Sequence, residues 1–381
     1  MRIAQIAPLI ERVPPLLYGG TERVVAALTE ELVRRGHDVT LFASGDSETS
    51  AQLVPIAERA LRLDPGVRDH YAHTMRELGA VFERAGEFDL IHNHLDYFAW
   101  PFARLAHTPV VTTMHGRLDL PDLAAIARDY PEQPLVSISD SQRLPLPWAN
   151  WVATVYNGLD LNPYRFHDQP GAYFAFIGRI APEKNIEGAI DIARATGIPL
   201  KIAAKVDPAD EDYYQATIKP RIDGRLIEYI GEIGEHEKAD FLGPAYALLF
   251  AVDWPEPFGL AMAEAMACGT PVLGLRRGSV PEVVEDGATG FVRNSEDELL
   301  AAAAGASGDR PPGLPSARGG ALQRRRDDRW LRGRSTVAWP GRLPTTVPGV
   351  DEHGATGRAD HAHFERRGAA RHTGAGGQPW H

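Results

Sequence analysis

The stretch that decides the fold is WPEPFGLAMAEAMACGTPVLG, residues 254–274. Pro257 fixes its own φ and disfavours helical backbone at Glu256, the residue before it. We therefore predict a helix that opens at 258–260 and runs through the alanine-rich segment that follows. On this reading Glu256 lies just before an apolar helix, and Glu264 lies about two turns inside it.

The chemistry of this segment indicates a particular kind of ligand. The first N–H groups of a helix have no partner within the helix and attract anions, phosphates above all. Gly259 allows a ligand to approach the backbone closely. Carboxylates repel phosphates, but they accept hydrogen bonds from sugar hydroxyls. The segment therefore suits a nucleoside diphosphate sugar, with phosphates at the helix start, the ribose at one glutamate and the sugar at the other.

Strand-like and helical patterns alternate along most of the chain. Thr21 is the predicted N-cap of a helix over 21–36, and a second helix is predicted over 186–197. Short, apolar, β-branched runs predict strands at 2–9, 37–44, 89–94, 109–116, 134–140, 172–180, 199–206, 225–231, 246–252 and 271–275. Such alternation is typical of parallel βαβ units. The turn-rich segment 158–171 divides it into two doubly wound halves.

Composition excludes several classes of protein. A chain of 381 residues with 44% hydrophobic residues is large enough for two or three domains. Its net charge of −11 argues against nucleic acid or an anionic membrane as the main partner. A single cysteine, Cys268, rules out a disulfide framework and favours a cytoplasmic location. There is no signal peptide pattern and no apolar run long enough to span a membrane.

The motif E-P-F-G-L-x-x-x-E, followed by A-M-A-x-G-x-P-V, resembles the E-x7-E motif of retaining family 4 glycosyltransferases with the GT-B fold. The resemblance extends over roughly residues 1–300, through the motifs YGGTERVV (18–25), TMHG (113–116), VYNGLD (155–160), FIGRIAPEKN (176–185) and GSVPEVVEDGATGFV (278–292). It implies an α/β fold of two Rossmann-like domains that face each other across a cleft. We place an acceptor-side domain at 1–160 and a nucleotide-sugar-binding domain at 161–304.

The resemblance also implies roles for matching residues. Arg179 and Lys184 would hold the diphosphate, as two cations at a strand end can on physical grounds. Glu264 would bind the ribose hydroxyls. Glu256 would bind the transferred sugar and stabilise its developing positive charge.

Further donor contacts are implied around these four residues. His115 would hydrogen-bond the transferred sugar, and the glycine loop of Gly19 and Gly20 would approach the diphosphate. Backbone amides would come from Phe258, Gly259 and Leu260.

The implied reaction is transfer of a hexose, most readily from a UDP-sugar, with retention of configuration. The leaving phosphate oxygen takes the acceptor proton, so no separate base is expected, and the resemblance also implies that no metal cofactor is used. The acceptor would be a small molecule, a lipid or a glycan. The alternatives are a nucleotide-sugar epimerase on the same fold and a nucleotide-sugar-binding protein without turnover.

Some residues allow two interpretations at this stage. His92, Asn93, His94 and Asp96 could form a metal site, but they also suit a strand end that contacts the acceptor or sugar. Arg179 and Lys184 could instead form a surface ion pair with Glu183. Residues that could lie near the cleft are Tyr18, Asp140, Arg143, Lys205 and Ile233. Asn185 stands where the family more often has glycine.

The end of the chain has a different composition. Residues 306–381 contain 13 arginines against 7 acidic residues, and they lack lysine, isoleucine, methionine, tyrosine and asparagine. We predict a disordered tail over 305–381. Because shifted GC-rich codons produce this bias, we also hypothesise that a frameshift replaced the native ending after about residue 305.

Overall fold

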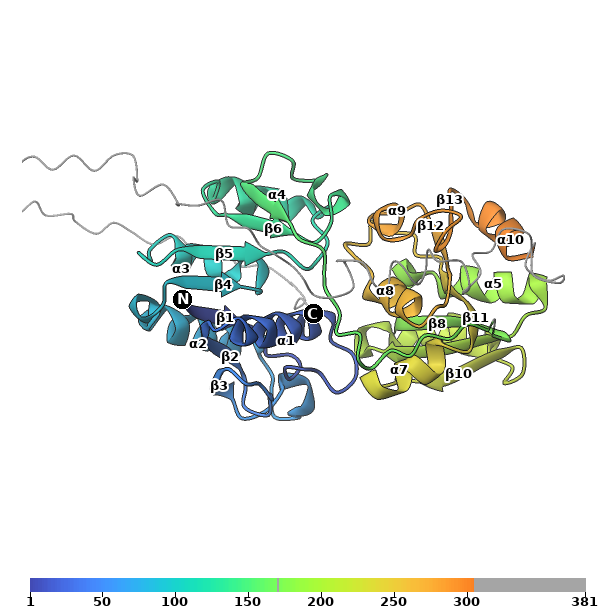
Figure 1. Cartoon of the computed structure of the whole chain (residues 1–381), viewed down its shortest axis with the longest axis horizontal. Helices are drawn as coiled ribbons and strands as arrows, with labels where there is room; N and C mark the ends of the chain where they lie inside the picture. The colour runs from blue at the N-terminus through green and yellow to red at the C-terminus, as the bar shows by residue number, and fades with distance from the viewer. Residues whose placement is uncertain (170, 305–381) are drawn as a thin grey trace, which may run out of the picture. The chain divides into compact units, whose positions relative to one another are not determined.

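A computed structural model describes residues 1–169 and 171–304, so the predictions for the tail lie outside the described residues. The chain forms two wholly parallel sheets (Figure 1). The first has the order β3-β2-β1-β4-β5-β6-β7. Its strands are β1 (Arg2–Ile6), β2 (Asp38–Ser44), β3 (Gln52–Ala57), β4 (Leu90–Asn93), β5 (Val110–Thr113), β6 (Leu135–Ser137) and β7 (Trp151–Thr154).

The second sheet has the order β10-β9-β8-β11-β12-β13. Its strands are β8 (Tyr173–Ile180), β9 (Leu200–Val206), β10 (Ile227–Gly231), β11 (Ala245–Phe250), β12 (Val272–Leu275) and β13 (Gly290–Arg293). In both sheets the strand order reverses beside the strand that comes first in the sequence, between β1 and β4 in the first sheet and between β8 and β11 in the second. Open α/β sheets bind ligands beyond the carboxyl ends of the strands at such a reversal.

Helices connect the strands and cover the sheets. Those of the first half are α1 (Gly20–Arg34), α2 (His70–Glu83), α3 (Trp100–Ala103) and α4 (Pro121–Asp129). Those of the second half are α5 (Ile186–Thr196), α6 (Glu211–Tyr213), α7 (Glu235–Leu242), α8 (Leu260–Ala267), α9 (Val280–Val283) and α10 (Glu296–Ala304). Helix α1 packs against β2, and α10 packs against α5 and β12 (Figure 1).

Helix α8 is the predicted apolar helix, and its burial explains its composition. Met262, Ala265 and Met266 are almost wholly inaccessible and belong to the core cluster that includes Leu248 and Val272 of the adjacent strands. Small residues let this helix lie close to the sheet, which brings the residues before it to the strand ends. The predicted α/β class with two Rossmann-like halves is confirmed, whereas the boundary near residue 160 stays a prediction.

Three details differ from the sequence-based predictions. Helix α1 begins at Gly20, after Gly19, and shows no side-chain cap, so Thr21 is not the N-cap. Because α8 begins only at Leu260, Glu264 lies about one turn inside it rather than two. Strands β3, β7 and β13 were not predicted. Within the described part of the chain no helix is long and apolar enough to cross a membrane.

Candidate active site

The loops after strands of both sheets line one cavity of about 500 Å³. All ten residues predicted from the sequence lie on its wall: Gly19, Gly20, His115, Arg179, Lys184, Glu256, Phe258, Gly259, Leu260 and Glu264. They come from the segments that follow β1, β5 and β11, and from the end of β8 and the turn after it. Residues up to 245 positions apart in the sequence are thus brought together.

Glu256 is held by two donors on the cavity wall. Its Oε2 accepts hydrogen bonds from Nζ of Lys184 at 2.5 Å and from Nε1 of Trp254 at 2.9 Å. The Lys184 ammonium also lies 4.6 Å from the centroid of the Trp254 ring, within the range of a cation–π contact. Glu256 is 9% exposed, so this carboxylate is largely removed from water and keeps a fixed direction.

The turn after β12 holds the backbone on either side of Glu256. Ser279 donates its backbone N–H to the Glu256 carbonyl and its hydroxyl to the Phe258 carbonyl, both at 2.9 Å. Gly278 has a φ of 49°, and an added Cβ would lie 2.3 Å from the Glu256 carbonyl oxygen. Only glycine therefore allows this close approach of the two backbones.

Lys184 ends a 3₁₀ turn (Pro182–Lys184), and Asn185 fixes how this turn enters α5. Asn185 has left-handed backbone, with φ 51° and ψ 53°, which asparagine tolerates better than most residues. Its side chain accepts from the Gly188 N–H and donates to the Ala251 carbonyl. This explains how asparagine replaces the glycine that the family more often has.

Arg179 lies near the end of β8 with its side chain 31% exposed. Its guanidinium pairs with Glu183 at 2.5 Å and with Asp210 at 3.5 Å. Burial alone would lower the pKa of Arg179, but the two carboxylates raise it above its ordinary value. The ion pair with Glu183 thus exists, and it lies on the wall of the cavity rather than on a remote surface.

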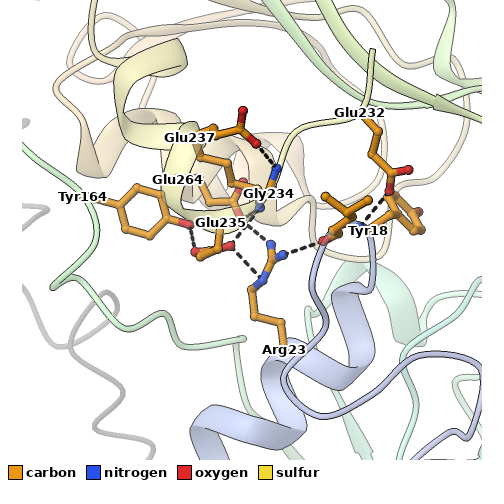
Figure 2. Close-up of polar contacts among 10 residues, drawn as sticks. Tyr18, Arg23, Tyr164, Glu232, Gly234, Glu235, Glu237 and Glu264 are labelled. Atoms are coloured by element: carbon orange, nitrogen blue, oxygen red, sulfur yellow. Dashed lines mark hydrogen bonds and ion pairs between the residues drawn. The ribbon is translucent and has the colours of Figure 1, made fainter. Parts of the chain in front are cut away.

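Glu264 lies at the centre of a buried charge network (Figure 2). Its Oε1 accepts from Nζ of Lys238 at 2.6 Å and from the Arg23 guanidinium at 3.0 Å. Glu264 is 2% exposed; burial would raise the pKa of its carboxyl, but Lys238 and Arg23 lower it below the ordinary value. The carboxylate is therefore ionised at neutral pH, and Glu264 forms part of the cavity wall.

A second carboxylate, Glu235, completes this network. Its Oε2 pairs with Arg23 at 3.0 Å and with Lys238 at 3.3 Å, and its Oε1 accepts from the Tyr164 hydroxyl at 2.5 Å (Figure 2). Unlike Glu264, Glu235 does not line the cavity. Arg23 also donates to the Leu17 carbonyl at 3.1 Å, which ties the glycine loop to the network.

His115 belongs to a cluster of buried imidazoles. Its Nε2 lies 2.9 Å from Nδ1 of His94, and the His94 and His92 rings lie 4.2 Å apart. Burial lowers the pKa of His115 to about 3 and that of His92 to about 4, so both are neutral. Burial raises the pKa of Asp96 to about 6, and the backbone N–H of His115 moderates the increase.

The remaining predicted contacts divide into two groups. Tyr18 and Ile233 line the cavity, whereas Lys205, Asp140 and Arg143 do not. Lys205 pairs with Asp207 at 3.0 Å. No group of three or more histidine, cysteine or acidic residues within 1–169 and 171–304 is arranged to hold a metal ion, so the metal interpretation of the histidine cluster finds no geometric support.

Sequence reasoning missed the residues that hold the two glutamates in place. They are Arg23, Lys238, Glu235, Tyr164 and Trp254. Arg23 follows the glycine loop directly in GGTER, and Trp254 precedes Glu256 by two residues. Arg23 and Trp254 could therefore have been predicted from their closeness to recognised motifs. Lys238 and Glu235 lie in a segment with no motif.

Comparison with known proteins identifies the family. Residues 18–161 match the family described as Glycosyltransferase Family 4, and residues 165–305 match the family described as Glycosyl transferases group 1. The chain belongs to the family 4 glycosyltransferases. The D-inositol 3-phosphate glycosyltransferase of Mycolicibacterium smegmatis is 26% identical over 347 residues, which cover 73% of this chain and 76% of that protein.

Solved structures of other proteins show the same fold. The sucrose-phosphate synthase of Thermosynechococcus elongatus has a TM-score of 0.71 at 17% identity, covering 87% of this chain and 95% of that one. Anabaena HepE in complex with UDP and glucose has a TM-score of 0.67 at 16% identity, covering 87% and 96%. The GT-B fold is therefore confirmed, and this glycosyltransferase has the predicted pair of Rossmann-like domains.

Proposed function

We propose that this glycosyltransferase transfers a hexose from a UDP-sugar to a hydroxyl of its acceptor with retention of configuration. The observation that supports this most directly is the meeting of two cations and two oriented carboxylates on one cavity wall. HepE, which shares the fold, is known in complex with UDP and glucose and with UDP-glucose. That likeness supports UDP as the first donor nucleotide to test.

The roles we propose follow from charge and direction. Arg179 and Lys184 bind the diphosphate, together with the amides at the start of α8 and the glycine loop. Glu264 binds the ribose hydroxyls, because a buried, ionised carboxylate can accept both of them. Glu256 faces the transferred sugar and stabilises the positive charge that develops on its ring.

Loss of the leaving group governs the chemical step. As the bond from the anomeric carbon to the phosphate oxygen breaks, negative charge grows on the diphosphate, and Lys184 and Arg179 stabilise it. The acceptor oxygen bonds to the same face of the anomeric carbon, and the leaving phosphate oxygen takes its proton. The charge on the phosphate is met by protein cations, so we propose that no metal is needed.

The acceptor is a small molecule, a lipid or a glycan, bound from the side of the first sheet. Relatives named as D-inositol 3-phosphate glycosyltransferases make inositol phosphates the first compounds to screen. We also propose that the enzyme acts in the cytoplasm.

The first test is thermal unfolding with UDP, GDP and ADP. A nucleotide at 100 times its Kd stabilises the folded protein by about 2.7 kcal/mol, so UDP alone should raise the melting temperature clearly. Transfer is then followed with UDP-glucose and an acceptor panel, with and without EDTA, and NMR of the product reports the anomeric configuration. No shift with any nucleotide refutes the donor site.

The same assays separate the alternatives. A binding protein without turnover would bind UDP-glucose and release no UDP with any acceptor. An epimerase would convert the sugar of UDP-glucose without an acceptor. An inverted product would refute retention while leaving glycosyl transfer intact.

A further inference from the structure

Gln5, His94 and His115 form a chain of hydrogen bonds that ends at the cavity. Gln5 lies on β1, His94 directly follows β4, and His115 is the second residue after β5. Since β4 pairs with both β1 and β5, the ends of these three strands lie side by side. Oε1 of Gln5 lies 2.8 Å from Nε2 of His94, and Nδ1 of His94 lies 2.9 Å from Nε2 of His115. Gln5 is 0% exposed and His94 is 3% exposed, so water does not compete for these bonds.

The order of donors and acceptors along this chain follows from the orientation of the Gln5 amide, whose Oε1 faces His94 and whose buried Nε2 has no hydrogen-bond partner among the described residues. A carbonyl oxygen only accepts, so the bond to Gln5 requires a proton on Nε2 of His94. A neutral imidazole carries one N–H, and burial keeps the pKa of His94 well below its ordinary value. Nδ1 of His94 is therefore an acceptor, and Nε2 of His115 must donate to it.

This order determines the chemistry that His115 offers to a ligand. With its proton on Nε2, His115 has a lone pair on Nδ1. Among the residues that the structure describes, none makes a hydrogen bond to this nitrogen. His115 itself lines the cavity, so Nδ1 is the ring atom left for a ligand.

We propose that Gln5 and His94 are positioning residues, which hold His115 in the Nε2–H tautomer so that Nδ1 accepts a hydrogen bond from a hydroxyl of the transferred sugar. This inference rests on the proposed function, in which His115 contacts that sugar. The arrangement also suits the reaction electrostatically. A neutral acceptor adds no positive charge beside a sugar ring that becomes cationic, whereas an imidazolium would oppose that charge.

His92 provides a matched control within the same cluster. Its ring lies against that of His94, but its Nε2 lies 2.8 Å from the Thr113 hydroxyl. Among the described residues, His92 makes no hydrogen bond or ring contact to His115. His92 is also absent from the cavity wall. Replacing either ring by phenylalanine keeps an aromatic ring in the stack, and only His94→Phe breaks the chain to His115.

The first experiment reads the tautomers directly and needs no substrate. In the full-length protein labelled with ¹⁵N at the histidine rings, two-bond ¹H–¹⁵N spectra at pH 7 distinguish Nε2–H from Nδ1–H. The signals are assigned by their loss in His94→Asn and His115→Phe. We expect both residues to be neutral with the proton on Nε2. A proton on Nδ1 of His115, or an imidazolium at either residue, overturns the proposal.

The second experiment measures how the chain affects sugar binding. Calorimetry with UDP and UDP-glucose separates the nucleotide from the sugar. We expect His94→Phe to bind UDP like the wild type but to lose about five- to tenfold in affinity for UDP-glucose, the size of one neutral hydrogen bond. In His94→Asn the Oδ1 atom can still accept from His115, so most of this loss should be recovered. The His92→Phe control should match the wild type.

The outcomes separate this inference from the function on which it rests. If the wild type binds no nucleotide, the proposed function fails, and the tautomer is still decided by the spectra. If UDP-glucose binds equally to His94→Phe and to the wild type, the positioning role fails and the donor site stands. Equal losses of UDP-glucose affinity in His94→Phe and His92→Phe would indicate a packing effect and would also overturn the positioning role.

Discussion

Substitution of Glu264 by glutamine tests whether this carboxylate binds the ribose. The change keeps the shape of the side chain and removes its charge. Lys238 and Arg23 then face a neutral acceptor, although both still pair with Glu235. Because the Glu235 carboxylate remains as a counter-charge, we expect the free energy of unfolding to fall by only about 2–3 kcal/mol, near the lower end of the cost of breaking a buried ion pair. This corresponds to a melting temperature about 5–10 °C lower.

The effect on donor binding is measured separately from stability, with UDP and 2′,3′-dideoxy-UDP. Hydrogen bonds to a charged acceptor contribute about 1 kcal/mol more than those to a neutral one, so losing the charge should cost about five- to tenfold in UDP affinity. The wild type should prefer UDP over the dideoxy analogue by at least about tenfold. In Glu264→Gln this preference should fall to severalfold or less, since the interaction that distinguishes the two ligands is weakened.

Glu235→Gln is the matched control for this prediction. It removes a carboxylate that pairs with the same two cations, but Glu235 lies outside the cavity wall. The control should unfold at a lower temperature and keep the wild-type preference for UDP over its analogue. If Glu264→Gln also keeps that preference, Glu264 does not contact the ribose and the assignment is wrong.

Three further predictions concern Lys184 beside Glu256, the close backbone contact at Gly278, and the buried Glu77. Lys184→Met removes the cation beside Glu256 and the proposed leaving group, so the transfer rate at saturating donor should fall about 10²–10³-fold; a change below threefold would contradict the role. Gly278→Ala places a Cβ against the Glu256 backbone and should abolish transfer, whereas Gly79→Ala, in open space on α2, should keep activity and slightly raise the melting temperature. Glu77 is fully buried with no hydrogen-bond partner in the described structure, and burial raises its pKa well above the ordinary value, so stability falls as the pH rises above its unfolded pKa. The free energy of unfolding of Glu77→Gln, relative to that of the wild type, should therefore rise by up to about 1.4 kcal/mol per pH unit in melts from pH 5 to 8. A difference in stability that does not change with pH would refute the burial argument.

The sequence predicted every interior strand of both sheets but missed three of the four edge strands, since of these only β10 was predicted. Residues 246–252 and 271–275 are continuous apolar runs because β11 and β12 lie inside the second sheet. By contrast β3, β7 and β13 are edge strands with a weaker pattern, and β3 even contains Pro55. Edge strands need fewer apolar residues, so periodicity alone did not detect these three.

The site was predictable where short motifs determine local backbone, and unpredictable where charges pair over long distances. Pro257 and Gly259 fix the start of α8 from within the motif itself. The partner of Glu264 on α1, Arg23, is 241 residues away in sequence, and nothing in either segment specifies that pairing. Only the packing of the chain brings these two side chains together.

The network explains why an apolar segment carries one carboxylate just before helix α8 and another about one turn inside it. Helix α8 must be apolar, because Met262, Ala265 and Met266 are buried in the core. A buried carboxylate is stable only with charged or hydrogen-bonding partners, and each glutamate has its own set. Lys184 and Trp254 hold Glu256 before the helix, and Lys238 and Arg23 hold Glu264 inside it. Since these sets come from different elements, the two carboxylates are oriented independently, as a donor with a sugar at one end and a ribose further along requires.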